Sequence, residues 1–367
     1  MKRFLKITAL FLLPVVFVCA VFFAALLRSG ELIDARQAAA QDVTLFGLAY
    51  RDDTRSYKQA VAARKGADLL VLGTSRSMQF RGEFFDTDSF YNAGGGIAFM
   101  PQAPFFMQSL PKNKLPKHLL LVLDQYFFNE DWASIDLERD SETFTFRPVD
   151  FWYSYKRIFT DYADGKYRLL DVLQNPQGVY GVAAAGKGAG FYHDGSYSYG
   201  NAVLHPEKSN DANFVDTYER IRTASRRFEY GDNVSEPNTE ALAQLLAFCA
   251  ENDIMVTAII PPYAPSVWKK MQESGNYTYM EKISPTLAPL FARYDFELFD
   301  YSYLPETNDA QYIDGFHGSD RVYAALCARL AQDSPSLAPL LDKDALTALF
   351  TADGNPLTVI FKGGQTQ

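Results

Sequence analysis

The chain has 367 residues, 48% of them hydrophobic, which is enough for a folded protein with a substantial core. Its formal net charge of -9 at pH 7 argues against the phosphate backbone of nucleic acid as a main partner. Neither metal-ligand spacing nor a disulfide framework is visible among the three cysteines, and we expect no metal, no cofactor and no nucleic acid.

Two of these cysteines, Cys249 and Cys327, lie in apolar runs with helical spacing. Buried cysteines in such runs are commonly free thiols, and this is the state that we predict. A disulfide between them is the alternative.

The amino-terminal segment predicts where the protein is located. Lys2, Arg3 and Lys6 precede an uncharged run over residues 7–27, which as a helix is long enough to cross a bilayer core of ~30 Å. Cationic residues at the start favour leaving this end in the cytoplasm and exporting the rest. We therefore predict that residues 1–28 are a retained single-pass anchor in the cell membrane. A cleaved signal peptide is the alternative, although its apolar region is normally shorter.

After the anchor, residues 29–64 are polar and alanine-rich and are expected to form a stalk or linker. A catalytic domain of the α/β class is predicted over residues 65–334. It begins with a short apolar run, 68–72, that is typical of a buried parallel strand. Gly73 breaks this strand, so that Ser75 falls just beyond its carboxyl end, where ligands bind in open α/β sheets.

Two further strands are predicted over 89–91 and 118–123. The first ends in the glycine-rich residues 92–96, and the second is followed by the polar and aromatic residues 124–129. Because the carboxyl ends of parallel strands meet at one edge of the sheet, these segments are expected to contribute to an active site with Ser75.

Residues 130–235 interrupt the α/β alternation and are predicted to be an insertion rich in aromatic residues. We interpret it as a lid or substrate surface over the carboxyl edge of the sheet, since aromatic faces suit sugar rings. A small packed subdomain whose aromatic residues form a core is the alternative. The insertion also contains His193, Asp194 and Ser196, a rival triad-like cluster that no predicted strand precedes.

The alternation resumes at residue 238. Helices are expected over 239–252, 279–294 and 321–332, and strands over 254–260 and 296–299. The strand over 254–260 is expected to end at the two prolines that precede Tyr263. Residues 335–367 are predicted to be a carboxyl-terminal extension, helix-like over 344–350 and strand-like over 357–361.

A serine hydroxyl needs a base, and a base needs an orienting group. Among the four histidines, His317 is distinguished by Asp314 three residues before it, a spacing at which one turn brings two side chains together. We predict a triad in which Asp314 holds one ring nitrogen of His317 while the other nitrogen faces Ser75.

The order of these segments resembles the SGNH (GDSL-like) hydrolase superfamily. Gly73-Thr74-Ser75 matches its nucleophile block, with Thr74 in place of the usual aspartate, and residues 314–317 match its last block. The resemblance implies a flavodoxin-like three-layer parallel sheet and an oxyanion hole. That hole would use the N–H of Ser75, a glycine N–H and a side-chain donor from the third block, where this chain departs from the family pattern. The glycine N–H would come from Gly94, Gly95 or Gly96, and the side-chain donor would be Gln125, with Asn129 as its substitute. The residues expected to bind substrate are Arg76, Tyr263 and Asn129.

For Arg76 and Tyr263 a structural salt bridge and a packed ring remain alternatives to substrate binding. The membrane anchor and the motifs after the strands are similar to those of membrane-anchored SGNH-like proteins that modify cell-envelope polymers, such as the D-alanine transfer protein and the alginate O-acetylation proteins. That similarity implies a membrane-bound O-acyltransferase as partner and O-acyl transfer to a cell-envelope polysaccharide through an acyl-serine. An O-acyl esterase and a catalytically silent envelope-binding protein are the alternatives.

Overall fold

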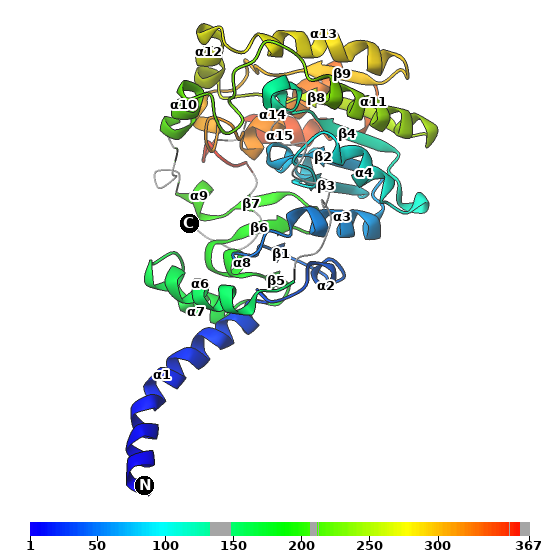
Figure 1. Cartoon of the computed structure of the whole chain (residues 1–367). Helices are drawn as coiled ribbons and strands as arrows, with labels where there is room; N and C mark the ends of the chain where they lie inside the picture. The colour runs from blue at the N-terminus through cyan, green and yellow to red at the C-terminus, as the bar shows by residue number, and fades with distance from the viewer. Residues whose placement is uncertain (133–147, 206–210, 212, 352, 360–367) are drawn as a thin grey trace. The chain divides into compact units, whose positions relative to one another are not determined.

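The computed structural model describes residues 1–132, 148–205, 211, 213–351 and 353–359, which form two compact units. Unit 1 contains residues 1–53, 148–193 and 197–201, and unit 2 contains the remaining described residues, including 194–196. Figure 1 shows the ribbon with the labels used below. The protein is of the mixed α/β class, as predicted.

A five-stranded, wholly parallel sheet forms the centre of unit 2. Its strands are β2 (Leu69–Gly73), β3 (Phe90–Gly94), β4 (His118–Val122), β8 (Met255–Ile260) and β9 (Glu297–Asp300), in the order β3-β2-β4-β8-β9. In register, Leu69 of β2 lies between Phe90 of β3 and His118 of β4. All residues of β2, β3 and β4 are buried, which explains their nearly continuous apolar sequences.

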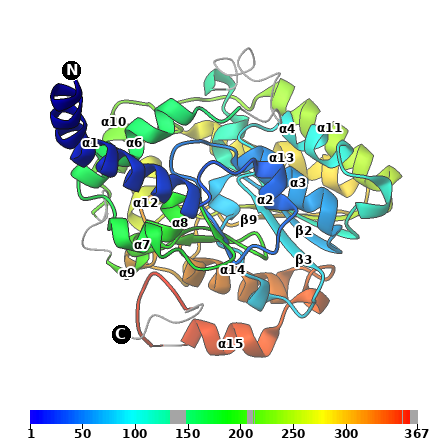
Figure 2. The ribbon, with the colours of Figure 1, turned by 90° about the horizontal axis from the view of Figure 1, so that it is seen from below.

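Helices cover both faces of this sheet. Those of unit 2 are α3 (Thr54–Lys65), α4 (Gln102–Gln108), α10 (Val215–Arg222), α11 (Glu236–Glu251), α12 (Pro265–Ser274), α13 (Thr278–Ala292), α14 (Asp320–Asp333) and α15 (Lys343–Thr351). The short helix α9 (Asn201–Leu204) belongs to unit 2 except for its first residue, which is assigned to unit 1. Figure 2 shows α14 and α15 on one side of the strands and α4, α11 and α13 on the other. Cys249 and Cys327 are buried and free, which confirms that prediction.

The strand order determines where a ligand would bind. From β2 the chain first forms β3 on one side and then crosses to β4 on the other side of β2. In such sheets the crevice at this reversal, outside the carboxyl ends of the strands, is the usual binding site. Ser75 directly follows β2 and therefore lies at this position.

The predicted carboxyl-terminal extension is part of unit 2. Its helix α15 packs against α14, and Leu341 bridges to Phe85 near the start of β3. The buried carboxylate of Asp320 accepts hydrogen bonds from the Thr358 hydroxyl and the Val359 N–H, at 2.8 and 2.9 Å. Residues 357–359 form no strand, and the rest of the predicted strand, 360–361, lies outside the described residues.

The domain boundaries after the anchor differ from those predicted. Unit 1 contains α1 (Lys2–Arg28), α2 (Ala35–Ala39), α6 (Phe151–Ala163), α7 (Leu169–Leu173) and α8 (Val182–Lys187), with strands β1 (Leu45–Phe46), β5 (Val179–Tyr180), β6 (Ala189–Tyr192) and β7 (Tyr197–Tyr199). Because β1 pairs with both β5 and β6, residues 29–53 are not a free stalk. The insertion is also not a single subdomain, since residues 202–205 and 213–235 belong to unit 2.

Helix α1 is long and apolar enough to span a membrane. Its last turns also belong to the core of unit 1, because Ala25 and Leu26 are fully buried with Ile158 of α6 and Val172 of α7. Figure 1 shows α6 and α7 beside this end of α1. Tyr167 is buried in the same cluster, so aromatic residues of the insertion serve in part as core, although Trp152 remains 76% exposed.

One buried histidine makes the stability of unit 2 dependent on pH. Burial lowers the pKa of His118 to about 4, although the Glu297 carboxylate opposes this shift, and its ring lies 2.9 Å from the Thr257 hydroxyl. The unfolded chain has the ordinary value of about 6.5, so between these values it binds more protons than the folded chain does. We expect acidification from pH 6.5 to 4.5 to remove about 2 kcal/mol of unfolding free energy.

The measurement is chemical denaturation across this pH range with His118→Gln, which retains a hydrogen-bonding group but does not titrate. The variant should lack this part of the pH dependence. Equal slopes in the two proteins would show that His118 is not responsible.

Candidate active site

The turn after β2 presents Ser75 at the carboxyl edge of the sheet. Thr74 caps a single 3₁₀ turn over Ser75–Ser77, its hydroxyl oxygen accepting a hydrogen bond from the Arg76 N–H at 3.2 Å. The Thr74 hydroxyl in turn donates to the buried Asp124 carboxylate at 2.5 Å, which links the turn to the residue after β4. Thr74 thus fixes the turn through buried hydrogen bonds, while the Ser75 side chain remains partly exposed.

The structure brings Ser75, His317 and Asp314 together. The Ser75 Oγ lies 2.9 Å from the His317 Nε2, and the His317 Nδ1 lies 2.9 Å from the Asp314 Oδ2. The Asp314 Oδ1 also accepts from the N–H groups of Phe316 and His317, at 2.8 and 2.6 Å. Nδ1 therefore acts as donor to Asp314, which leaves Nε2 with its lone pair toward the serine hydroxyl.

These contacts keep Asp314 ionised. Burial alone would raise the pKa of the Asp314 carboxyl, but the charge and hydrogen bond of the His317 ring and the two backbone N–H groups outweigh burial and hold the pKa below its usual range. Chemically, the arrangement can accept a proton from Ser75 at Nε2 and stabilise the resulting imidazolium through Asp314.

Arg76 does not face a substrate. Its side chain is fully buried and forms an ion pair with Asp124 at 3.0 Å. The same guanidinium donates to the carbonyl oxygens of Pro261 and Pro262 at 3.0 and 2.8 Å. Burial alone would lower the pKa of Arg76, but Asp124 outweighs it and the pKa is raised, so the group stays charged. The alternative of a structural salt bridge is therefore the correct one.

The guanidinium of Arg76 also lies between two aromatic rings. Its central carbon is 4.4 Å from the ring centre of Tyr263 and 4.6 Å from that of Phe316. Tyr263 is completely buried, so the predicted substrate-binding role is wrong and the packed-ring alternative holds. Because Phe316 directly precedes His317, Arg76 supports the loop that carries His317.

The predicted side-chain donors to an oxyanion are engaged elsewhere. The amide nitrogen of Gln125, which is fully buried, donates to the Pro261 carbonyl and the Ser302 hydroxyl at 2.8 and 2.9 Å. The Asn129 amide donates to the carbonyls of Glu229 and Tyr230, and its oxygen caps the following turn. The predicted roles of Gln125 and Asn129 as donors to an oxyanion are therefore wrong, because these amides join backbone segments inside unit 2.

The three predicted glycine donors are occupied as well. The Gly94 N–H donates to the Asn92 side chain at 2.6 Å, the Gly95 N–H to the Gly73 carbonyl at 2.9 Å, and the Gly96 N–H to the Ala93 carbonyl at 2.8 Å. Of the predicted oxyanion donors, only the Ser75 N–H has no acceptor among the described residues. These glycines instead permit close packing, since a Cβ at Gly95 would lie 2.3 Å from the Met78 side chain.

The rival cluster around residue 194 is structural. Ser196 is fully buried, and its hydroxyl donates to Asp194 at 2.7 Å and accepts from Arg81 at 3.1 Å. The Asp194 carboxylate also accepts from the Gly82 N–H. Ser196 is therefore bonded to a carboxylate and an arginine and has no exposed hydroxyl.

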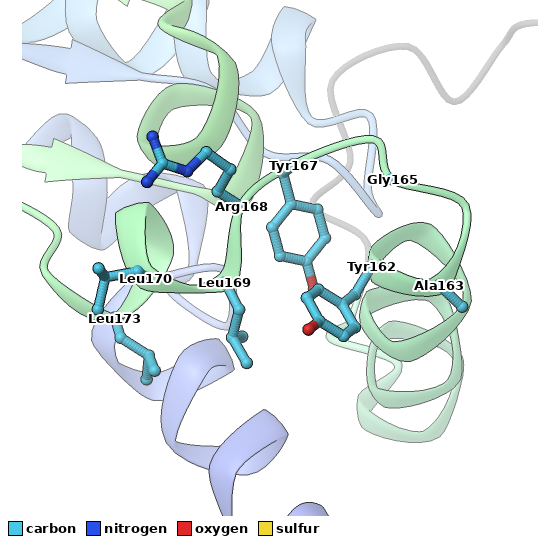
Figure 3. Close-up of a pocket in the computed structure, with 8 residues that line it drawn as sticks. All are labelled: Tyr162, Ala163, Gly165, Tyr167, Arg168, Leu169, Leu170 and Leu173. Atoms are coloured by element: carbon cyan, nitrogen blue, oxygen red, sulfur yellow. The ribbon is translucent and has the colours of Figure 1, made fainter.

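Two pockets are defined by the residues that line them, and neither is lined by Ser75 or His317. In unit 1 a pocket of about 780 Å³ is lined by Tyr162, Ala163, Gly165, Tyr167, Arg168, Leu169, Leu170 and Leu173, with the two tyrosine rings on one side and the leucines on the other (Figure 3). Its lining has no serine, histidine or carboxylate. A pocket of about 380 Å³ in unit 2 is lined by Ala98, Phe99, Trp132 and three arginines. Its arginines, at positions 220, 226 and 227, form no recognisable sequence motif, so the sequence alone did not indicate this pocket.

No protein-family model matches the chain, and no curated protein matches it. Within the described part of the chain, no group of three or more histidine, cysteine or acidic side chains could hold a metal ion.

Proposed function

We propose that the protein is an SGNH-like serine acyltransferase that modifies a cell-envelope polysaccharide. The single observation that carries the proposal is the contact of the Ser75 hydroxyl with a histidine that is itself held by a carboxylate. The strand order, which numbered along unit 2 is 2-1-3-4-5, is the flavodoxin-like order and supports the SGNH fold. Helix α1 would anchor the chain, with the catalytic unit outside the membrane, where a membrane-bound O-acyltransferase would deliver the acyl group.

The chemistry follows from the geometry. As the Ser75 Oγ attacks the acyl carbonyl, its proton passes to the His317 Nε2, and the Ser75 N–H donates to the developing oxyanion. The protonated ring then gives this proton to the leaving group, and an acyl-serine remains. A sugar hydroxyl next loses its proton to Nε2 and attacks the ester, and Ser75 recovers the proton as the acylated sugar leaves.

One observation favours a second candidate, a catalytically silent envelope-binding protein. An oxyanion hole normally uses more than one donor, and each missing donor typically lowers turnover by about 100-fold or more. Here the glycine N–H groups and the Gln125 amide are bonded within the protein. An esterase would use the same triad with water as acceptor.

The test is acylation of the full-length chain in detergent by p-nitrophenyl acetate. We expect a burst of about one nitrophenolate per chain, and an acetyl group on the peptide that contains Ser75 in mass spectra. Turnover that rises when polysaccharide fragments are added indicates transfer, and rapid turnover in water alone indicates an esterase. Folded protein that gives no burst and no acetylated peptide would support the silent protein.

A further inference from the structure

The pocket of about 380 Å³ in unit 2 combines two flat rings with three guanidinium groups. Phe99 follows the turn after β3 and stacks on Trp132, with ring centres 5.4 Å apart. The charged lining comes from Arg220 in the last turn of α10 and from Arg226 and Arg227 in the turn beyond it. A pocket of this composition suits a ligand that has both an apolar face and a negative charge.

This pocket adjoins the residues behind His317. The Arg227 guanidinium lies 5.4 Å from the ring centre of Tyr126 and 5.9 Å from that of Phe316. The Phe316 ring is in turn 4.9 Å from the His317 ring, and Trp132 lies 4.7 Å from Tyr126. The Phe316 ring therefore lies between the Arg227 guanidinium of the pocket and the His317 ring.

The charges at the pocket are not balanced within it. Arg220 and Arg226 both bind the carboxylate of Asp216, Arg226 at 2.7 Å. Arg227 has no ion-pair partner among the described residues, and the Nε of Arg220 is buried without a hydrogen-bond partner there. Two of the three cations thus share one carboxylate, and a bound anion would supply a partner for the third.

The backbone that carries these arginines is strained. Ala224, Arg226 and Arg227 have φ angles of 48°, 52° and 78°, a region that residues other than glycine rarely adopt. Such conformations cost free energy and persist where the surrounding structure holds them, often at ligand sites. Here Phe228 is buried directly after the turn, and the Tyr230 hydroxyl donates to the Ile221 carbonyl at 2.8 Å.

We propose that this pocket binds a carboxylate or phosphate group carried by a sugar unit of the acceptor polymer. Arg227 provides the main charged contact, and Phe99 lies against a sugar face. The identity of this ligand as acceptor rests on the proposed function, whereas the binding itself does not require catalysis. The acceptor polymer is therefore expected to be anionic.

The test is calorimetric binding of three oligosaccharides of equal length to the full-length chain in detergent. One is an oligouronate, one a phosphodiester-linked glycan and one a neutral glucan. We expect at least one anionic ligand to bind about 10-fold or more tightly than the neutral one, with an affinity that falls as salt is added. The tighter of the two anionic ligands distinguishes carboxylate from phosphate. Equal binding of all three would overturn the proposal.

Arg227→Gln should weaken binding of the anionic ligand about 10- to 100-fold and leave binding of the neutral ligand unchanged. Arg226→Gln is a second variant, and its expected loss is smaller because the Arg226 side chain is largely exposed and already paired with Asp216. The matched control is Arg222→Gln, because Arg222 ends α10 just before the turn that carries Arg226 and Arg227, but it pairs with Glu219 and does not line the pocket. If neither pocket variant weakens binding more than the control does, the pocket is not the site.

Ser75→Ala separates the two proposals. It should still bind the anionic ligand, because Ser75 does not line the pocket. Arginine-dependent binding without any acylation of Ser75 in the wild type would retain the pocket and remove the enzymatic proposal. Acylation of Ser75 with binding unaffected by the arginine variants would do the reverse.

Discussion

Replacing Ser75 with alanine is expected to lower acyl transfer by about 1,000-fold or more and to abolish labelling by a fluorophosphonate probe. The reason is that Ser75 supplies the nucleophilic oxygen, and residues of a triad act as a unit, so that loss of one removes most of the rate. The fold should be unaffected, because the Ser75 side chain is partly exposed and its only side-chain hydrogen bond among the described residues is with the His317 ring.

The matched control is Ser196→Ala, since Ser196 belongs to the rival cluster but its hydroxyl is buried between Asp194 and Arg81. The wild type and this control should both be labelled, as measured by gel fluorescence and by the mass of the modified peptide. Labelling of Ser75→Ala at the rate of the wild type would place the reactive serine elsewhere.

Replacing Arg76 with alanine is expected to lower the unfolding free energy of unit 2 by about 3–5 kcal/mol. The substitution leaves Asp124 as an uncompensated buried charge and removes the donors to the carbonyls of Pro261 and Pro262. It also removes the cation between Tyr263 and Phe316, which supports the His317 loop. A fall in kcat of the surviving folded protein is therefore expected as well.

Urea denaturation followed by circular dichroism measures this change. Arg329→Ala is the control, because Arg329 forms ion pairs with Asp333 and Glu306 on the surface, where such pairs contribute little to stability. If Arg76→Ala instead leaves stability unchanged and raises only KM, Arg76 contacts substrate and its structural assignment is wrong.

The parallel sheet and the meeting of Ser75 with His317 could be predicted from the sequence. Strands β2, β4 and β8 are short, mainly apolar runs, and glycine, polar residues or prolines end them, so that segments far apart in the chain are expected at one sheet edge. The spacing of Asp314 and His317 is local, and a single turn is enough to join their side chains.

The environment of the remaining site residues could not be predicted. Whether an arginine or an amide faces solvent or the interior depends on which carbonyl groups need donors, and the prolines that end β8 present two carbonyls to Arg76. Similarly, residues 29–53 lack strong periodicity, and β1 forms only because β5 and β6, far along the chain, offer it partners.

The burial of Ala25 and Leu26 bears on how the protein matures. A protease that cut after Arg28 would take away side chains that fill the interior of unit 1 and would leave Ile158 and Val172 facing an empty space. Removal of residues 1–28 would therefore destabilise the core of unit 1. A secreted form that starts at Ser29 should accordingly be prone to degradation, whereas the uncut chain is the form that keeps unit 1 intact.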